Sequence, residues 1–328
     1  MMLNLKRPLL RGPALILGVG MCFAALGALG TVYGIWTSRD VAIRQNETRL
    51  LATAHMLNAH AIQSLEAADM MLRRVNDNLK ELHGLDEAKF QEAVSAEHIF
   101  YMMRAATHGV PQVAGISLIA NNGRLLNFTR QFPPPDLSLH DQDYFLSHAA
   151  DPQLNLFIGR LTKNRITHAP YFYVARKLNS DPGQNLGLIV TGISTEFFNH
   201  FYQSAILGDM RITLFRDDGS ILARNFDVSD LEENRTQINP AMFRLIDGVE
   251  SRTGLTGGQE TPDSFNEMWA VERSSYLPIG IMASLPRELI LREWENQAIR
   301  FVIIGGTLSA ILILLTLILA RLVRQLEQ

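Results

Sequence analysis

The stretch ISLIANNGRLLNFT, from Ile116 to Thr129, is matched further along the chain by ITLFRDDGSILARN, from Ile212 to Asn225. In both stretches, apolar and polar residues alternate as in a strand before and after an Asn-Gly or Asp-Gly dipeptide. These dipeptides favour the primed turns of tight hairpins. A match of this length predicts two similar modules in tandem, and a chance likeness of two hairpins is the alternative. The recurring positions are Ile116, Leu118, Gly123 and Leu126, against Ile212, Leu214, Gly219 and Leu222.

Further strand-like runs follow each hairpin. In the first module, APYFYVARKL (169–178) and LGLIVTGIS (186–194) flank the turn NSDPGQN. In the second, FNEMWAVERSS (265–275) and IGIMASL (279–285) follow a polar, irregular stretch. The amphipathic segment PRELILREWENQ then predicts a helix that continues into an apolar run. The chain therefore predicts antiparallel sheets joined to a terminal helix.

Two uncharged apolar runs, 14–36 and 301–320, are each long enough to span a bilayer as a helix. Basic residues precede the first run and follow the second, so the positive-inside bias places both termini in the cytoplasm and residues 39–298 outside. We therefore expect a two-pass protein of the bacterial inner membrane with a periplasmic region. The alternative for the first run is a cleaved signal peptide, with ALGALG resembling a cleavage site. The basic residues are Lys6, Arg7, Arg11, Arg321 and Arg324.

Charge and cysteine content narrow the possible partners. The formal net charge of −3 does not favour nucleic-acid binding. The single cysteine, Cys22, lies in the first apolar run, so the outer region has no disulfide and no thiolate for metal binding or catalysis.

After Arg39 the chain has the pattern of one long helix. Apolar residues recur at steps of three and four, which is the seam of a helix that is packed along its length. The spacing fits a helix lying against its own domain and equally a homodimer stalk that carries motion toward the membrane. The seam residues are Leu50, Ala54, Leu57, Ala61, Leu65, Ala68, Leu72, Val75, Leu79 and Leu82.

This layout resembles the double Cache family, the extracellular tandem PAS-like sensors of bacterial receptors. The resemblance covers nearly the whole chain and includes a series of short motifs in the family's order. It is similar above all to the sensor regions of diguanylate cyclases and histidine kinases. The motifs are DQDYF at 141–145, LFIG at 156–159, NRITH at 164–168, ARKL at 175–178 and LGLIVTGISTEFFNHFY at 186–202.

The resemblance implies an α+β fold: a long N-terminal helix with two tandem PAS-like antiparallel-sheet modules, flanked by two transmembrane helices. It implies a receptor region that binds a small molecule in the distal module and signals through the second transmembrane helix. The expected divisions are 1–12 (cytoplasmic), 13–38 (transmembrane), 39–206 (long helix and distal module), 207–298 (proximal module), 299–321 (transmembrane) and 322–328 (start of a signalling helix).

The resemblance also implies a ligand pocket in the first module, with DQDYF on its rim or lid. Asp143 would accept from a ligand amine or hold a basic side chain, Tyr144 would offer its hydroxyl, and Arg165 would bind a carboxylate. Tyr171 and Tyr173 share one strand face, whereas Phe172 and Arg176 share the other, and only one face can line a pocket. The expected ligand-binding residues are Asp143, Tyr144, Arg165, Tyr171, Tyr173 and Arg176.

One departure from the family bears on the ligand. Amino-acid-binding double Cache domains tend to carry an arginine, a spacer and Trp-Tyr near the lid, where this chain has 141–144, DQDY. A standard amino-acid ligand is therefore not implied. The basic residues of the next loop suit an organic anion as the ligand. The alternative is that they form a solvated loop without a ligand. These residues are Arg160, Lys163, Arg165 and His168.

The same residues are compatible with other chemistries. Asp141 and Asp143 could form an acid/base pair, but no nucleophile motif accompanies them. His140 and His148 could join the two aspartates in a metal site. The sequence contains no Walker phosphate-binding loop. We expect no cofactor, no metal and no catalysis in this chain.

The residues after Ala320, RLVRQLEQ, look like the start of a signalling helix. We expect a cytoplasmic output beyond this sequence, a diguanylate cyclase or histidine kinase domain or a partner protein. The alternative is a stand-alone membrane-anchored binding protein.

Overall fold

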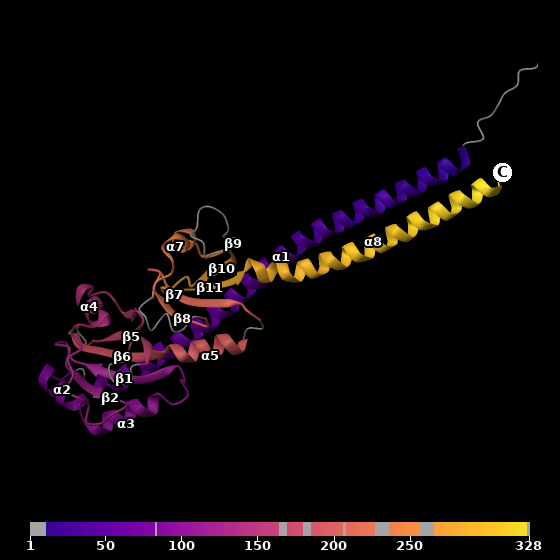
Figure 1. Ribbon diagram of the computed structural model, residues 1–328. Helices are drawn as coiled ribbons and strands as arrows, with labels where there is room; N and C mark the ends of the chain where they lie inside the picture. The colour runs from indigo at the N-terminus through magenta and orange to yellow at the C-terminus, as the bar shows by residue number, and fades with distance from the viewer. Residues whose placement is uncertain are drawn as a thin grey trace, which may run out of the picture. The chain divides into compact units, whose positions relative to one another are not determined.

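The computed structural model describes residues 11–82, 84–163, 169–179, 185–205, 208–226, 236–255 and 266–326 (Figure 1). The chain divides into two compact units. The sheet unit comprises residues 49–285, and the helical unit comprises residues 1–48 together with 286–328.

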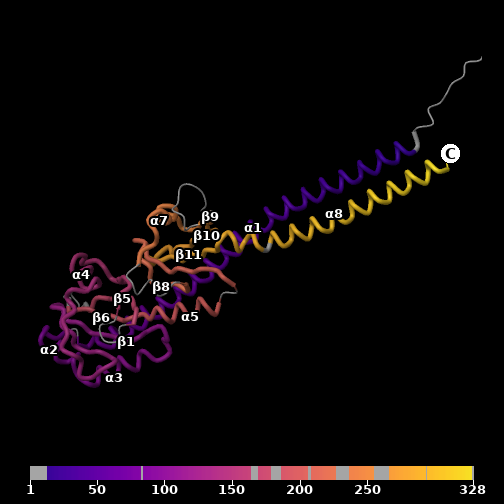
Figure 2. Tube along the Cα trace, viewed as in Figure 1, coloured from indigo at the N-terminus to yellow at the C-terminus, as the bar shows by residue number. Residues whose placement is uncertain are grey.

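The first module of the sheet unit is built on a six-stranded antiparallel sheet in the order β2-β1-β6-β5-β3, with β4 paired to β5. Figure 2 labels β1, β5 and β6 of this sheet along the Cα trace. Alternating Val, Ile, Leu and aromatic residues form the central strands, as the sequence predicts. Its strands are β1 (Val113–Ile119), β2 (Leu125–Phe128), β3 (Leu156–Ile158), β4 (Thr162–Lys163), β5 (Pro170–Asn179) and β6 (Asn185–Ser194). Its helices are α1 (Arg11–Asn78), η1 (Lys80–Leu82), α2 (Glu87–Val94), α3 (Glu97–Ala106) and α4 (Asp143–Ala150).

The second module follows α5 (Thr195–Ala205) and contains a five-stranded antiparallel sheet in the order β8-β7-β11-β10-β9. The first hairpin of each module therefore occupies one edge of its sheet, and the last strand pairs with the first. Its elements are β7 (Arg211–Arg216), β8 (Ile221–Arg224), α7 (Pro240–Ile246), β9 (Ser251–Leu255), β10 (Glu267–Arg273) and β11 (Ile279–Pro286).

The two hairpins share hydrogen bonds as well as sequence, which confirms the predicted tandem repeat. Thr129 Oγ1 accepts from the Ile116 N–H, and Asn225 Oδ1 accepts from the Ile212 N–H, at 2.8 Å in both cases. Each closing side chain thus lies at the last residue of its matched stretch. The second hairpin therefore repeats the geometry of the first.

The predicted primed two-residue turns are wrong for both hairpins. The Gly123 N–H donates to the Ala120 carbonyl at 2.9 Å, and the Gly219 N–H donates to the Arg216 carbonyl at 2.8 Å. Each glycine is thus the fourth residue of its turn, with φ of 84° and 79° respectively. This is the longer loop in which a left-handed glycine follows the turn and forms a bulge, and glycine reaches that φ without strain.

The seam of α1 is covered by the chain's own domain. Gln112 donates to the Ser64 carbonyl at 2.7 Å from the first module, and Tyr276 of the second donates to Glu66 Oε1 at 2.8 Å. Within one copy of the chain the seam is therefore occupied, and a stalk that uses these residues against a second copy is not available. Nine seam residues are buried: Leu50, Ala54, Leu57, Ala61, Leu65, Ala68, Leu72, Val75 and Leu79.

The helical unit pairs the first part of α1 with α8 (Arg287–Leu326), and both helices are long and apolar enough to cross a membrane. A side chain at Gly20 would meet Thr316, and one at Gly305 would meet Thr31. Residue numbers therefore increase along α1 in the direction in which they decrease along α8, so the two helices are antiparallel. Small residues at the contacts let the backbones approach closely, as in membrane helix pairs.

Candidate ligand-binding site

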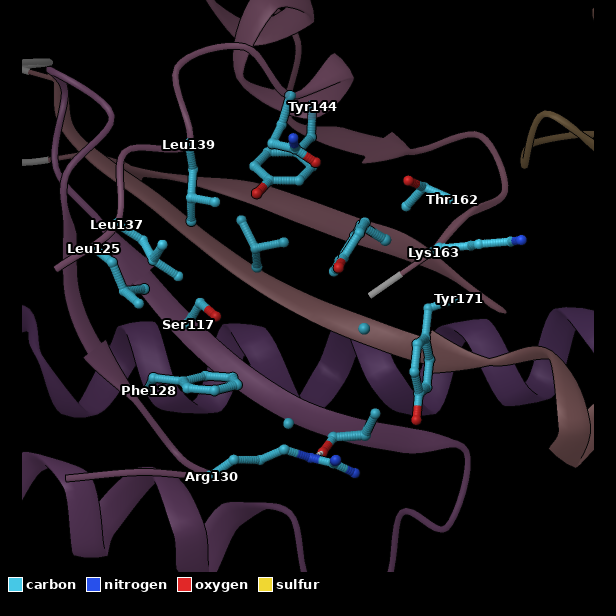
Figure 3. A pocket seen from close by; sticks show the side chains of 16 residues that line it. Ser117, Leu125, Phe128, Arg130, Leu137, Leu139, Tyr144, Thr162, Lys163 and Tyr171 are labelled. Carbon is cyan, nitrogen blue, oxygen red and sulfur yellow. Dashed lines mark hydrogen bonds between the residues drawn. The ribbon is translucent and has the colours of Figure 1, made fainter. Parts of the chain in front are cut away.

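A cavity of about 190 Å³ lies in the first module, between the sheet and the segment that carries α4 (Figure 3). A single water needs roughly 10–15 Å³ by the same measure, so the cavity has room for a small organic molecule. Its lining residues are Ala114, Gly115, Ser117, Leu125, Phe128, Arg130, Leu137, Leu139, Gln142, Tyr144, Thr162, Lys163, Tyr171, Tyr173, Val190 and Gly192.

Three of the predicted site residues meet at this cavity. Tyr171 and Tyr173 lie two residues apart on β5 and face it together, as strand alternation requires. Tyr144, in the first turn of α4, closes it from the other side, and its ring centroid lies 5.3 Å from that of Tyr173 at an interplanar angle of 64°. Aromatic edges and hydroxyls therefore line a pocket whose remaining walls are largely apolar.

Among the described residues, the two charged side chains that line the cavity are both basic. Arg130 follows β2, and its Nε donates to the Ala114 carbonyl at 2.7 Å, which holds the guanidinium at the rim. Lys163 lies on β4 next to Thr162, and Figure 3 shows both residues beside the cavity. No carboxylate is among the lining residues that the structure describes. The local field of the cavity therefore favours an anion.

Asp143 is not among the lining residues, because its carboxylate binds main-chain N–H groups. Oδ2 accepts from the Arg160 N–H and Oδ1 from the Tyr144 N–H, each at 2.7 Å. A Cβ at Gly159 would lie 3.1 Å from Asp143 Oδ2, which explains the glycine of the LFIG motif. Asp143 thus holds the chain beside the lid, through the main chain of Arg160 rather than through a basic side chain.

Arg176 lies away from the cavity. Its guanidinium pairs with Asp69 of α1, with Nη2 at 2.9 Å from Oδ2. Of the two faces of β5, the face of Tyr171 and Tyr173 lines the pocket and the face of Arg176 packs against the long helix. Arg165, expected to be the main charge partner of a ligand, lies outside the described residues, as does His168.

Arg130 is the lining residue that sequence reasoning missed. Strand alternation does not place it, because β2 ends at Phe128 and Arg130 lies in the turn in which the Gln131 N–H donates to the Phe128 carbonyl, at 3.2 Å. Lys163 was noted in the basic loop but not among the candidate binding residues. Ser117 and Thr162 add polar groups that no local motif marked, and Gln142 of the DQDYF motif adds another.

The histidines near the lid have other neighbours. His148 Nδ1 lies 2.7 Å from the Tyr144 carbonyl, and its ring meets that of Phe157 edge-on. His140 Nδ1 lies 2.8 Å from Ser138 Oγ. Within the described part of the chain, no group of three or more His, Cys, Asp or Glu side chains is arranged to hold a metal ion.

The matching face of the second module carries an apolar cluster. Phe215 and Ile221 correspond in the repeat to Ile119 and Leu125 beside the first cavity, and here Met242 and Ile246 of α7 pack against them. A side chain on Gly219 would run into Phe243 of the same helix. The two modules thus share a sheet but differ in what covers it.

The fold, a long helix packed against two tandem antiparallel sheets, is shared with solved bacterial sensory domains, as the sequence resemblance predicts. The extracellular domain of rpHK1S-Z16, described as a histidine kinase, matches with a TM-score of 0.63 and 23% identity over 76% of this chain and 98% of that one. The sensory domain of the Campylobacter jejuni chemoreceptor Tlp3, with isoleucine bound, matches with a TM-score of 0.52 and 11% identity over 77% and 97%.

The ligand-binding domain of the Pseudomonas fluorescens chemoreceptor CtaA, in complex with L-isoleucine, has a TM-score of 0.53 and 10% identity over 79% of this chain and 99% of that one. No protein-family model matches the sequence, and a search of curated proteins finds no match. At these identities the likeness establishes the fold.

Proposed function

We propose that this chain is the ligand-sensing and transmembrane region of a bacterial receptor. The first module binds a small organic anion, and the change passes through α8 to a cytoplasmic output. The observation that carries the proposal is a cavity that lies under an aromatic lid in a sensory-domain fold, and whose described lining residues include two basic and no acidic side chains. The chain itself acts by binding and not by catalysis.

The similar structures support a carboxylate ligand. Tlp3 is seen with isoleucine and CtaA with L-isoleucine or L-serine, and all of these carry a carboxylate. An α-amino acid also carries an ammonium group, which is best met by an acceptor carboxylate. Here Asp143 is engaged by two N–H groups, so an acid without the α-ammonium group fits the cavity better.

The membrane arrangement is part of the proposal. Two candidate membrane helices and the sensory fold support an inner-membrane protein with residues 39–298 in the periplasm. We also propose a homodimer. Because the α1 seam is buried, a dimer through α1 would use its opposite face, where Met56 and Met70 are exposed. A stand-alone anchored binding protein is the second candidate function, and it would use the same pocket.

The test is a thermal-shift screen of the full chain in detergent micelles, against carboxylic acids, amino acids, amines and purines. A ligand present at a hundred times its dissociation constant stabilises the protein by about 2.7 kcal/mol. The matched pair L-lactate and L-alanine separates an acid without the ammonium group from its amino-acid counterpart. We expect hits among the simple acids.

Arg130→Ala then tests the charge. Loss of a charge-assisted hydrogen bond, worth about 1.5–3 kcal/mol, should weaken anion binding roughly tenfold to a hundredfold. Arg124→Ala is the matched control, because Arg124 lies on the same hairpin but bonds to Gln91 on α2. Hits confined to amines, lost in Asp143→Ala and kept in Arg130→Ala, would contradict the anion proposal.

A further inference from the structure

Residues Ile158–Lys163, here named the strap, connect the cavity to the second module. Thr162 and Lys163 at one end line the cavity. In the middle, the Arg160 N–H is held by the lid residue Asp143, and the Gly159 N–H donates to the Tyr173 carbonyl at 2.7 Å. The strap is therefore fastened both to the lid helix α4 and to a strand that forms the cavity floor.

Two side chains of the strap, those of Arg160 and Leu161, contact the second module. Arg160 donates from Nε and Nη2 to Asp218 Oδ2, at 3.2 and 3.0 Å. Asp218 lies in the β7–β8 turn, where its other oxygen accepts from the Ser220 N–H at 3.1 Å. Leu161 packs against the apolar cluster beneath α7. One residue thus binds the lid through its main chain and the second module through its side chain.

The second module also reaches back to the strap. Arg216 Nη1 donates to the Ile158 carbonyl at 2.5 Å, and its guanidinium lies 5.4 Å from the Phe157 ring centroid. Arg216 Nη2 lies 3.3 Å from the same Asp218 oxygen that Arg160 binds. The contacts therefore form a network from the lid, through the strap, to the first hairpin of the second module.

We infer that the strap is the element that couples the state of the pocket to the membrane-proximal module, with Asp143 as a positioning residue and Arg160–Asp218 as the joint. The inference rests on the proposed function, because ligand binding is what would move Lys163 and the lid. An anion drawn to Lys163 shifts the strap, and the fixed Arg160 and Leu161 carry that shift to the β7–β8 turn. Such coupling requires a contiguous set of contacts and a measurable interaction between its ends.

The test measures hydrogen exchange by mass spectrometry on the full chain in detergent micelles, with no ligand added. Asp218→Asn should speed exchange in the β7–β8 turn and also in the 143–163 peptides of the lid and strap, by about two- to fivefold, the range for a partly exposed ion pair. Asp217→Asn is the matched control. Asp217 is the adjacent residue, but it pairs with Arg273 inside the second module, at 2.8 Å, so its effect should stay there.

Variants of Arg160 complete a double-mutant cycle with Asp218→Asn. Arg160→Ala should speed exchange at both ends and remove most of the effect of a further Asp218→Asn change on the lid. Arg160→Lys should restore part of the protection, because it keeps one donor. The α2 and α3 peptides, 87–106, should exchange as in the wild type.

Three results would overturn the inference. The first is unchanged hydrogen exchange of the 143–163 peptides in Asp218→Asn, and the second is an equal increase in their exchange in Asp217→Asn. The third is faster exchange throughout 87–106, which would mean general destabilisation. Because no ligand is used, failure here leaves the carboxylate proposal standing, and a failed carboxylate screen leaves this coupling result intact.

Discussion

Arg176 Nη2 of β5 lies 2.9 Å from Asp69 Oδ2 of α1, and this ion pair joins the first sheet to the long helix on the face opposite Tyr171 and Tyr173. The same carboxylate also accepts from Arg73 Nε, at 3.1 Å, one turn further along α1. One buried acid therefore holds a basic residue from each of two elements.

Arg176→Ala should destabilise the first module and leave its pocket chemistry in place. Asp69 is buried, and truncating the mostly buried Arg176 would leave that carboxylate with only a solvent-exposed partner. Breaking a buried pair costs about 3–5 kcal/mol, so the urea midpoint should fall clearly. Arg73→Ala, whose side chain is 62% exposed, is the control and should cost less than about 1 kcal/mol. Equal effects of the two variants would show that Arg176 does not anchor the sheet.

Leu65→Asp and Leu72→Asp should prevent folding of the sheet unit and not merely weaken dimerisation. Both leucines are essentially inaccessible within one chain, and an unpaired carboxylate there carries a penalty above about 4 kcal/mol. Met70→Asp is the matched control, since Met70 is 69% exposed on the same stretch of helix. Circular dichroism reports folding, and light scattering reports the oligomeric state. A folded monomer from Leu65→Asp would show instead that the seam belongs to a dimer.

The sequence predicted the elements of this fold because alternation and three–four spacing are local. The hairpin repeat, the strands and the division of β5 into a tyrosine face and a Phe172 and Arg176 face are all consequences of periodicity. The choice between those faces is not local, since it depends on Asp69, far away in the chain. The seam of α1 was ambiguous for the same reason, because spacing marks a buried stripe but not what covers it.

The site was less predictable, for a related physical reason. The motif DQDYF was predicted to lie at the rim or lid of a pocket, and two of its residues, Gln142 and Tyr144, line the cavity. The orientation of Asp143, however, is set by the main-chain N–H of Arg160, and no spacing rule encodes such a bond. The β1–β2 pairing skips from Asn127 to Leu125, so Leu125 and Phe128 both line the cavity, and Arg130 lines it from the turn that follows β2. The role of Arg165 stays a prediction.

Tyr144→Phe should weaken binding of the best carboxylate from the screen by about fivefold, or on the order of 1 kcal/mol. The variant keeps the ring and its contact with Tyr173 and removes only the hydroxyl. Tyr202→Phe is the control, because the buried hydroxyl of Tyr202, on α5, has no hydrogen-bond partner among the described residues. Isothermal titration should show unchanged affinity for that variant. Unchanged affinity in Tyr144→Phe would remove its hydroxyl from the site.

Gly20→Leu should separate the two helices of the helical unit. A side chain at this position would overlap Thr316 of α8, whereas one at Gly18 would meet nothing within 4 Å. Gly18→Leu is therefore the matched control. A Cβ at position 305 would lie 3.2 Å from Thr31 Cβ, so a Thr31→Cys, Gly305→Cys pair should cross-link in a Cys22→Ser background. Cross-linking should fall in Gly20→Leu and persist in Gly18→Leu. Full cross-linking in both variants would contradict the small-residue contact.

Acidification should loosen the lid through His148. This side chain is 4% exposed, its Nε2 has no hydrogen-bond partner among the described residues, and burial lowers its pKa below the usual value of 6.5. The Tyr144 carbonyl opposes that shift in pKa, and so does Asp151, whereas Lys177 adds to it. Because the unfolded chain binds the proton more tightly, stability is complete above about pH 6.5 and falls as the pH drops below that value.

The measurement is the urea midpoint of the full chain from pH 7.5 to pH 5, compared with His148→Gln. The wild type should lose more stability over this range than the variant, because glutamine does not titrate. His140→Gln is the control, since His140 is more accessible and bonds to Ser138. Hydrogen exchange of the 143–150 peptide should rise on acidification in the wild type and not in His148→Gln. Parallel pH profiles for wild type and His148→Gln would mean that this histidine is not the group that weakens the lid.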